Sequence, residues 1–218
     1  MMTDSIFLDI CIALLGLATV GLHIVRRNNY EVVLYAVQSL AVVLLLVASF
    51  FHNHSTALLI IIALTLVVKV VLAPWFFLRL IKRHDLKFAA TTYANTSETF
   101  AVLAGILILV GSGILDSLTN IVPGNSVYLV VALSGIFASI LLMVNRKGAL
   151  SQVVGVLSLE NCIVAFAILA GLEQSVALQA GVIFDVSIWL IIAVTMVSLV
   201  YSHHGSLDVS IMKKLQDD

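Results

Sequence analysis

The sequence contains few charged residues for its length. Only 11% of its 218 residues are Asp, Glu, Lys or Arg, whereas 61% are hydrophobic, and a soluble domain is roughly 25% charged. The formal net charge is -1, so there is no basic surface of the kind that binds nucleic acid. The shortage of charge excludes a sizeable aqueous domain and indicates an integral membrane protein.

Cysteines and chemical motifs are scarce as well. The two cysteines, Cys11 and Cys162, lie in separate apolar runs without metal or disulfide spacing, and we interpret them as small core residues. The sequence has no glycine-rich phosphate loop, no nucleophile elbow and no cluster of metal ligands. We therefore expect the chain itself to bind no metal and no cofactor, which leaves proton or ion movement as the chemistry to consider.

Long apolar segments dominate the rest of the sequence. Seven of them, of which the fourth is the shortest, approach the length of a bilayer-spanning helix: roughly 5–25, 30–51, 57–81, 98–114, 126–144, 149–171 and 176–201. They predict an all-α, polytopic membrane protein with seven transmembrane helices. We divide it into an N-terminal three-helix half with a cytoplasmic linker, a connecting helix with an outer loop, and a C-terminal three-helix half with a cytoplasmic tail (1–97, 98–125 and 126–218).

Basic residues mark alternate ends of these segments. The loops at 52–56, 115–125 and 172–175 contain no Lys or Arg. By the positive-inside rule, this distribution predicts an outside N-terminus and a cytoplasmic C-terminus, and we expect a multi-pass protein of the cell inner membrane. The basic residues that obey the rule are Arg26, Arg27, Arg79, Lys82, Arg83, Lys87, Arg146, Lys147, Lys213 and Lys214.

Three ionisable residues lie within the apolar segments: Lys69, Glu160 and Asp185. A charge near the bilayer midplane is costly, and such residues usually face a water-filled path or a partner inside the protein. Lys69 and Glu160 fall at about the same depth, and Asp185 at another. We predict a proton relay in which Glu160 is the central acid, Asp185 is a second position, and Lys69 is an added charge that could tune or extend the path.

Structural alternatives remain open for each of these residues. Glu160 and Asp185 could be protonated acids hydrogen-bonded to a neighbouring helix, and the long Lys69 side chain could snorkel. Gln38 and Ser39 are interpreted as interhelical hydrogen-bonding residues, and Glu31, at the start of its segment, as solvated. We expect close helix packing at five glycines: Gly16, Gly21, Gly105, Gly111 and Gly113.

Four stretches resemble hydrogenase-4 component E, the membrane subunit of group 4 nickel-iron hydrogenase and formate hydrogenlyase complexes. They are YAVQSL at 35–40, KVVLAP at 69–74, GVLSLEN at 155–161 and HHGSLDV at 203–209. The last three segments also resemble the K subunit of complex I and the matching antiporter subunit. The positions that match are Asn145-Arg146-Lys147, Glu160, Asp185, where the K subunit has Glu, and Ser206-Leu207-Asp208.

The resemblance implies a non-catalytic membrane-arm subunit that supplies part of a proton path. Its expected partners are antiporter-like and complex-I-like membrane subunits together with soluble hydrogenase or dehydrogenase subunits, in which the redox chemistry takes place. This chain has no ligand set for nickel, an iron-sulfur cluster or flavin. Two alternatives remain: a purely structural membrane anchor of the complex, and an independent ion transporter.

Overall fold

A computed structural model describes residues 2–53, 56–83, 92–122 and 124–172 of the chain. The predicted seventh segment and Asp185 lie outside these residues. The described residues form helices joined by short turns, together with isolated bridge residues, among which Thr92 pairs with Arg146. The elements are α1 (Met2–Ile24), α2 (Asn28–Asn53), α3 (Thr56–Thr65), η1 (Leu66–Leu72), α4 (Ala73–Arg83), α5 (Thr96–Gly111), α6 (Asp116–Thr119), α7 (Ser126–Asn145) and α8 (Ala149–Leu169).

Five helical stretches among the described residues are long and apolar enough to cross a membrane. They coincide within a few residues with predicted segments one, two, three, five and six, so the prediction of an all-helical membrane protein is confirmed in this part of the chain. The fourth segment, α5, has 16 residues, or about 24 Å, which is short of a 30 Å bilayer core. The five stretches are Ile6–Ile24, Asn28–Phe51, Leu58–Arg83, Ser126–Asn145 and Ala149–Leu169.

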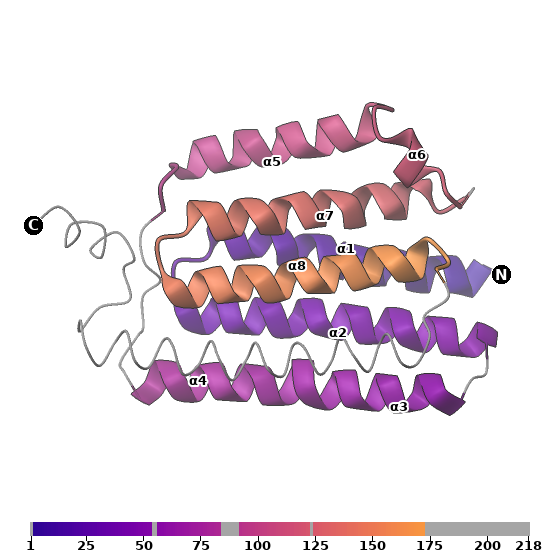
Figure 1. Ribbon diagram of the computed structural model, residues 1–218, viewed down its shortest axis with the longest axis horizontal. Coiled ribbons are helices and arrows are strands. Elements are labelled where there is room, and N and C mark those ends of the chain that lie inside the picture. The colour runs from indigo at the N-terminus through magenta and orange to yellow at the C-terminus, as the bar shows by residue number, and fades with distance from the viewer. Residues whose placement is uncertain (1, 54–55, 84–91, 123, 173–218) are drawn as a thin grey trace, which may run out of the picture.

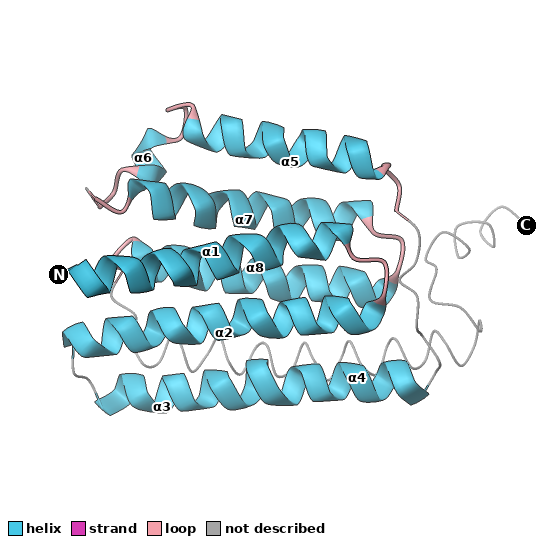
Figure 2. Cartoon of the chain, turned by 180° about the vertical axis from the view of Figure 1, so that it is seen from behind, coloured by secondary structure: helices cyan, strands magenta, loops and turns pink. Residues whose placement is uncertain are grey.

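The helices lie side by side along a common direction (Figure 1). α5 forms one edge, followed by α7, then α8 with α1 behind it, then α2, and finally the continuous α3–η1–α4 stretch at the other edge. The view from behind shows the same order with α1 in front (Figure 2). Since α2 packs against α1, α8, η1 and α4, polar residues on α2 can be shielded from lipid on several sides.

Two glycines allow α7 and α8 to approach closely. A Cβ atom on Gly155 would lie 2.7 Å from Met143 Cγ, and one on Gly135 would lie 2.8 Å from Cys162 Sγ. The expectation of close packing at Gly105 and Gly111 is wrong, because a Cβ at either position would meet no atom within 4 Å. Both belong to α5, which lies at the edge of the bundle and packs chiefly against α7.

Basic residues gather at one end of the bundle, which we call the basic end. The α1–α2 turn, the end of α4 and the α7–α8 turn all lie there (Figure 1), because successive helices run in opposite directions. The described residues that define it are Arg26, Arg27, Lys82, Arg83, Arg146 and Lys147. The side of the membrane that this end faces stays a prediction.

Candidate functional site

Lys69 and Glu160 form an ion pair in the middle of the bundle. Lys69 Nζ lies 2.6 Å from Glu160 Oε1, and the exposed fractions of the two side chains are 2% and 20%. Lys69 is therefore turned toward a protein partner and does not snorkel to an interface. The similar depth predicted for the two residues is consistent with this contact, whereas their direct pairing was not predicted.

Lys69 occupies the centre of a π-helix. η1 interrupts the α-helical hydrogen bonding between α3 and α4, and the Ala73 N–H donates to Val68 O, five residues back. Pro74 follows immediately; it has no N–H, and its ring crowds the carbonyl of Val70. This crowding favours a wider turn just upstream. A π-turn inserts an extra residue into the helix and often marks a functional site.

Asn161 extends the ion pair into a buried polar network. Lys69 Nζ donates to Asn161 Oδ1 at 3.2 Å. Asn161 Nδ2 in turn donates to Ser39 Oγ at 2.9 Å and to Gln38 Oε1 at 3.4 Å. Gln38, Ser39 and Asn161 have no exposed surface. These contacts confirm that Gln38 and Ser39 hydrogen-bond between helices, and they orient Asn161 so that its oxygen faces Lys69.

The far side of this network ends on backbone carbonyls. Gln38 Nε2 donates to Thr19 Oγ1 at 2.8 Å and to Ser158 Oγ at 2.9 Å. Thr19 donates to Leu15 O at 2.7 Å, and Ser139, which is 2.8 Å from Ser158, donates to Gly135 O at 2.8 Å. A carbonyl that accepts a hydrogen bond has no proton to pass on. Within the described residues, this branch, which also includes the Cys162 thiol, therefore positions Gln38 and offers no onward path through α1 or α7.

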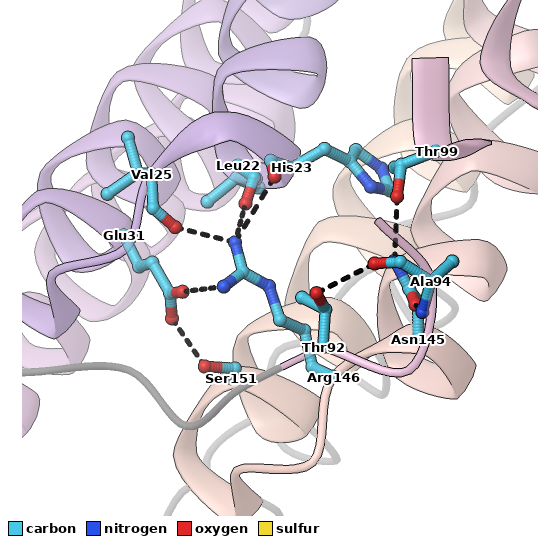
Figure 3. Close-up of polar contacts among 10 residues, drawn as sticks. All are labelled: Leu22, His23, Val25, Glu31, Thr92, Ala94, Thr99, Asn145, Arg146 and Ser151. Carbon is cyan, nitrogen blue, oxygen red and sulfur yellow. Dashed lines mark hydrogen bonds and ion pairs between the residues drawn. The ribbon is translucent and has the colours of Figure 1, made fainter. Parts of the chain in front are cut away.

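A second buried ion pair lies at the basic end (Figure 3). Arg146 Nη1 is 3.4 Å from Glu31 Oε1, and Ser151 Oγ donates to Glu31 Oε2 at 2.7 Å. Glu31 is 1% exposed, so its interpretation as a solvated residue is wrong. The reason is tertiary: the α7–α8 turn packs over the first turn of α2 and covers the carboxylate.

Arg146 also caps the end of α1. Its Nη2 atom donates to Leu22 O at 2.7 Å and to Val25 O at 2.6 Å (Figure 3). The last carbonyls of a helix have no intrahelical partner, so the guanidinium satisfies groups that would otherwise be buried alone. Burial lowers the pKa of Arg146 from its usual value, whereas the neighbouring Glu31 carboxylate acts to raise it.

Asn145 joins the start of α5 to the end of α7. Its backbone oxygen accepts from the Tyr93 N–H at 2.9 Å, and its Oδ1 accepts from the Ala94 N–H at 2.7 Å. Its Nδ2 donates to Thr99 Oγ1 at 3.0 Å (Figure 3). Asn145 and Arg146 therefore hold three chain segments together at the basic end.

The structure brings together two of the three predicted relay residues. Lys69 and Glu160 are in contact, and Asp185 lies outside the described residues. Sequence reasoning missed Asn161, which follows Glu160 directly, and the Glu31–Arg146 pair. Among the described residues, no group of three or more His, Cys, Asp or Glu is placed to hold a metal ion.

Comparison with known proteins yields one similarity without a functional name. An uncharacterized protein of Mycobacterium tuberculosis is 26% identical to this chain over 154 residues, which cover 70% of each sequence. No protein-family model matches the sequence, and no solved structure matches it either. These similarities assign no function, so a function can be inferred only from the geometry of the site itself.

Proposed function

We propose that this chain is a membrane-arm subunit of a complex-I-like, membrane-bound hydrogenase or formate hydrogenlyase-type complex, in which it supplies part of an intramembrane proton path. The Lys69–Glu160 pair is the observation that carries this proposal. Glu160 is the central acid, Lys69 its exchange partner, and Asp185 a second relay position. Hydrogen or formate turnover belongs to the partner subunits.

The pair is suited to proton transfer because an acid and an amine are already in direct contact, with 2.6 Å between Lys69 Nζ and Glu160 Oε1. Moving one proton from the Lys69 ammonium to the Glu160 carboxylate converts the ionic pair into a neutral amine and carboxylic acid. The pair carries no net charge in either form, so the exchange adds no charge to the membrane interior. Glu160 keeps 20% exposure, so part of its side chain lies at the surface of the chain, where a partner subunit of the proposed complex would meet it.

A static structural role explains the pair less well. A buried ion pair is weak evidence for stability, because desolvation of the two charges offsets much of their attraction. Apolar residues of similar volume would hold η1 against α8 at least as firmly. Keeping an acid and a base in contact at this depth is therefore better explained by a use for the proton.

The resemblance to hydrogenase-4 component E supports the identity of the partners. The stretches that carry it include Tyr35–Leu40, Lys69–Pro74 and Gly155–Asn161, and these contribute Lys69, Glu160 and Asn161 to the site. In this proposal the protein spans the cell inner membrane with its basic end in the cytoplasm.

Mild purification of the tagged full-length chain from its own membranes tests the assignment. We expect hydrogenase-like or dehydrogenase subunits and antiporter-like membrane subunits to co-purify in stable proportion. A lone chain that conducts ions in liposomes would replace the proposal with an independent transporter. If the Glu160→Gln complex assembles and translocates protons at the normal rate, the chain is only a structural membrane anchor of the complex.

A further inference from the structure

Tyr35 carries a fully buried hydroxyl that is incompletely hydrogen-bonded among the described residues. Its side chain has no exposed surface, no hydrogen bond of normal geometry reaches the hydroxyl, and the Ser39 side chain, one turn further along α2, is a polar group that interacts with it. Leaving a buried hydroxyl unsatisfied costs about 1–3 kcal/mol. Such a group calls for an explanation, and a water molecule or a proton path past the hydroxyl would supply one.

The position of Tyr35 on α2 suggests which groups it serves. Glu31, Tyr35 and Ser39 are spaced four residues apart, so they share one face of the helix. Glu31 belongs to the ion pair at the basic end, and Ser39 accepts a hydrogen bond from Asn161 beside Lys69. Tyr35 thus lies between the levels of the two buried ion pairs. Along the helix axis it is about 6 Å from Glu31 and about 6 Å from Ser39.

Apart from Ser39, the core cluster that the described residues form around Tyr35 is apolar. Tyr35 packs in this cluster with Phe77, Val154 and Leu157, none of which can exchange a proton. On α8 the hydroxyl of Ser151 faces Glu31, whereas Asn161 lies at the level of Lys69. The Tyr35 hydroxyl is therefore the polar group that α2 places between the two pairs.

We propose that Glu31 is a second proton-carrying acid, at the basic end, and that the Tyr35 hydroxyl passes protons between it and the Lys69–Glu160 pair. This inference rests on the proposed function and specifies the end from which the site is loaded. Ser39 lies beside Tyr35, and water molecules would bridge Tyr35 to Glu31 and to the Lys69–Glu160 pair. Protonated Glu31 gives its proton to the first water, which passes a proton to the Tyr35 oxygen as Tyr35 releases its own proton to the next water, and that water protonates the Glu160 carboxylate. Glu31 ends as a carboxylate, Tyr35 and both waters end neutral, and one proton has moved.

The contacts around Glu31 are compatible with changes in its protonation. Arg146 is fixed mainly by the short bonds from its Nη2 to the carbonyls of Leu22 and Val25, whereas its Nη1 contact to Glu31 is 3.4 Å long. Charge-assisted bonds of this type are usually about 2.7–2.9 Å. Glu31 can therefore gain a proton without displacing Arg146. Among the described residues, two further titratable groups act on Arg146: His23, near the end of α1, and Arg26, in the α1–α2 turn.

The test compares two tyrosine substitutions on the same helix in the assembled complex. Tyr35→Phe removes the buried hydroxyl at nearly constant volume, and Tyr30→Phe is the matched control at a residue that is 55% exposed. Inverted vesicles are energised with the electron donor of the co-purifying redox subunit, and protons translocated per electron are measured. We expect a fall of about tenfold or more for Tyr35→Phe and none for Tyr30→Phe, at equal amounts of complex.

Glu160→Gln in the same vesicles distinguishes a failure of the Tyr35 path from a failure of the proposed function. If Glu160→Gln abolishes translocation while Tyr35→Phe translocates normally, the Tyr35 path is wrong and the proposed function stands. If Glu160→Gln also translocates normally, the proposed function fails, and this inference fails with it. A purely structural Tyr35 would lower the amount of complex without changing protons per electron, which would equally overturn the inference.

Discussion

Lys69 Nζ and Glu160 Oε1 lie 2.6 Å apart, although one residue belongs to the helix at the edge of the bundle and the other to a central helix. The contact unites the two charges that the membrane would otherwise penalise separately. Asn161 and the polar residues of α2 then hold Lys69 in place. The middle of the described bundle thus holds an acid, a base and the hydrogen bonds that orient them, and the Glu31–Arg146 pair lies separately at the basic end.

Removing only Lys69 should destabilise the protein. Lys69→Met leaves the Glu160 carboxylate without its cation, and breaking one side of a buried pair costs about 3–5 kcal/mol. We expect a loss of about 3–5 kcal/mol, because a carboxylate at mid-bilayer depth that loses its cation has no water to replace it. Thermal or denaturant unfolding of the detergent-solubilised chain measures this change, and Lys82→Met, at an exposed lysine near the end of α4, is the control.

The double substitution Lys69→Met with Glu160→Gln should recover most of that loss, since both charges are gone. A double-mutant cycle between the two positions should give a coupling energy of at least about 1 kcal/mol. Additive effects would show that the two side chains do not interact in the membrane-embedded protein.

Gln38→Leu should weaken the bundle and disturb the site together. Gln38 donates to Thr19 and Ser158 and accepts from Asn161, so its loss leaves several buried groups with fewer partners. We expect a destabilisation of about 1–3 kcal/mol and slower proton translocation, because Asn161 is less firmly held beside Lys69. Unfolding midpoints and vesicle assays measure the two effects, and a fully stable Gln38→Leu protein would contradict the network.

The sequence predicted the described helices and placed Lys69 and Glu160 at a common level along the bundle. Apolar length and the spacing of basic residues located the five described spans, because a bilayer imposes that length on any helix that crosses it. Counting residues along two helices also put Lys69 and Glu160 at one level. Depth alone cannot pair two residues, since contact also depends on how each helix is rotated, and the π-helix at Leu66–Leu72 changes that rotation just at Lys69.

Glu31 shows that the place of a residue in an apolar segment does not determine whether its side chain is buried. A carboxylate in the first turn of a helix is ordinarily solvated, and it interacts favourably with the helix dipole. Here the turn that carries Arg146 folds over it. That turn is distant from Glu31 in sequence, and no local sequence pattern predicts the contact. The glycines were predicted only in part. Close packing is confirmed at Gly21, where a Cβ would lie 3.0 Å from Leu34 Cδ1, whereas the tighter contacts at Gly135 and Gly155 depend on the pairing of α7 with α8 and were not predicted.

Gly155→Ala should be harmful, whereas Gly105→Ala should not. A Cβ at Gly155 would lie 2.7 Å from Met143 Cγ and 3.2 Å from the Met143 backbone nitrogen, so α7 and α8 would have to separate. We expect a loss of about 1–3 kcal/mol from overpacking. Gly105 faces open space, and alanine there should be neutral or stabilising by up to about 1 kcal/mol. Equal unfolding midpoints for the two variants would contradict the close α7–α8 contact.

Arg146→Lys should destabilise the basic end even though it conserves charge. An ammonium cannot reproduce the fork with which Arg146 contacts Glu31 and the carbonyls of Leu22 and Val25 at once. The expected loss is about 1–3 kcal/mol, visible as faster hydrogen exchange at the end of α1 and a lower unfolding midpoint. Arg83→Lys, at an exposed position, is the control, and its effect should stay within about 0.5 kcal/mol.

The most direct measurement is the number of protons translocated per electron by vesicles that carry the assembled complex with Glu160→Gln. Glu98→Gln is the matched control: Glu98 is an exposed carboxylate in the capping box of α5, where glutamine serves equally well. We predict that translocation falls to background with Glu160→Gln and is normal with Glu98→Gln, at equal amounts of complex in the membrane. A Glu160→Gln complex that translocates protons at the normal ratio would contradict the account.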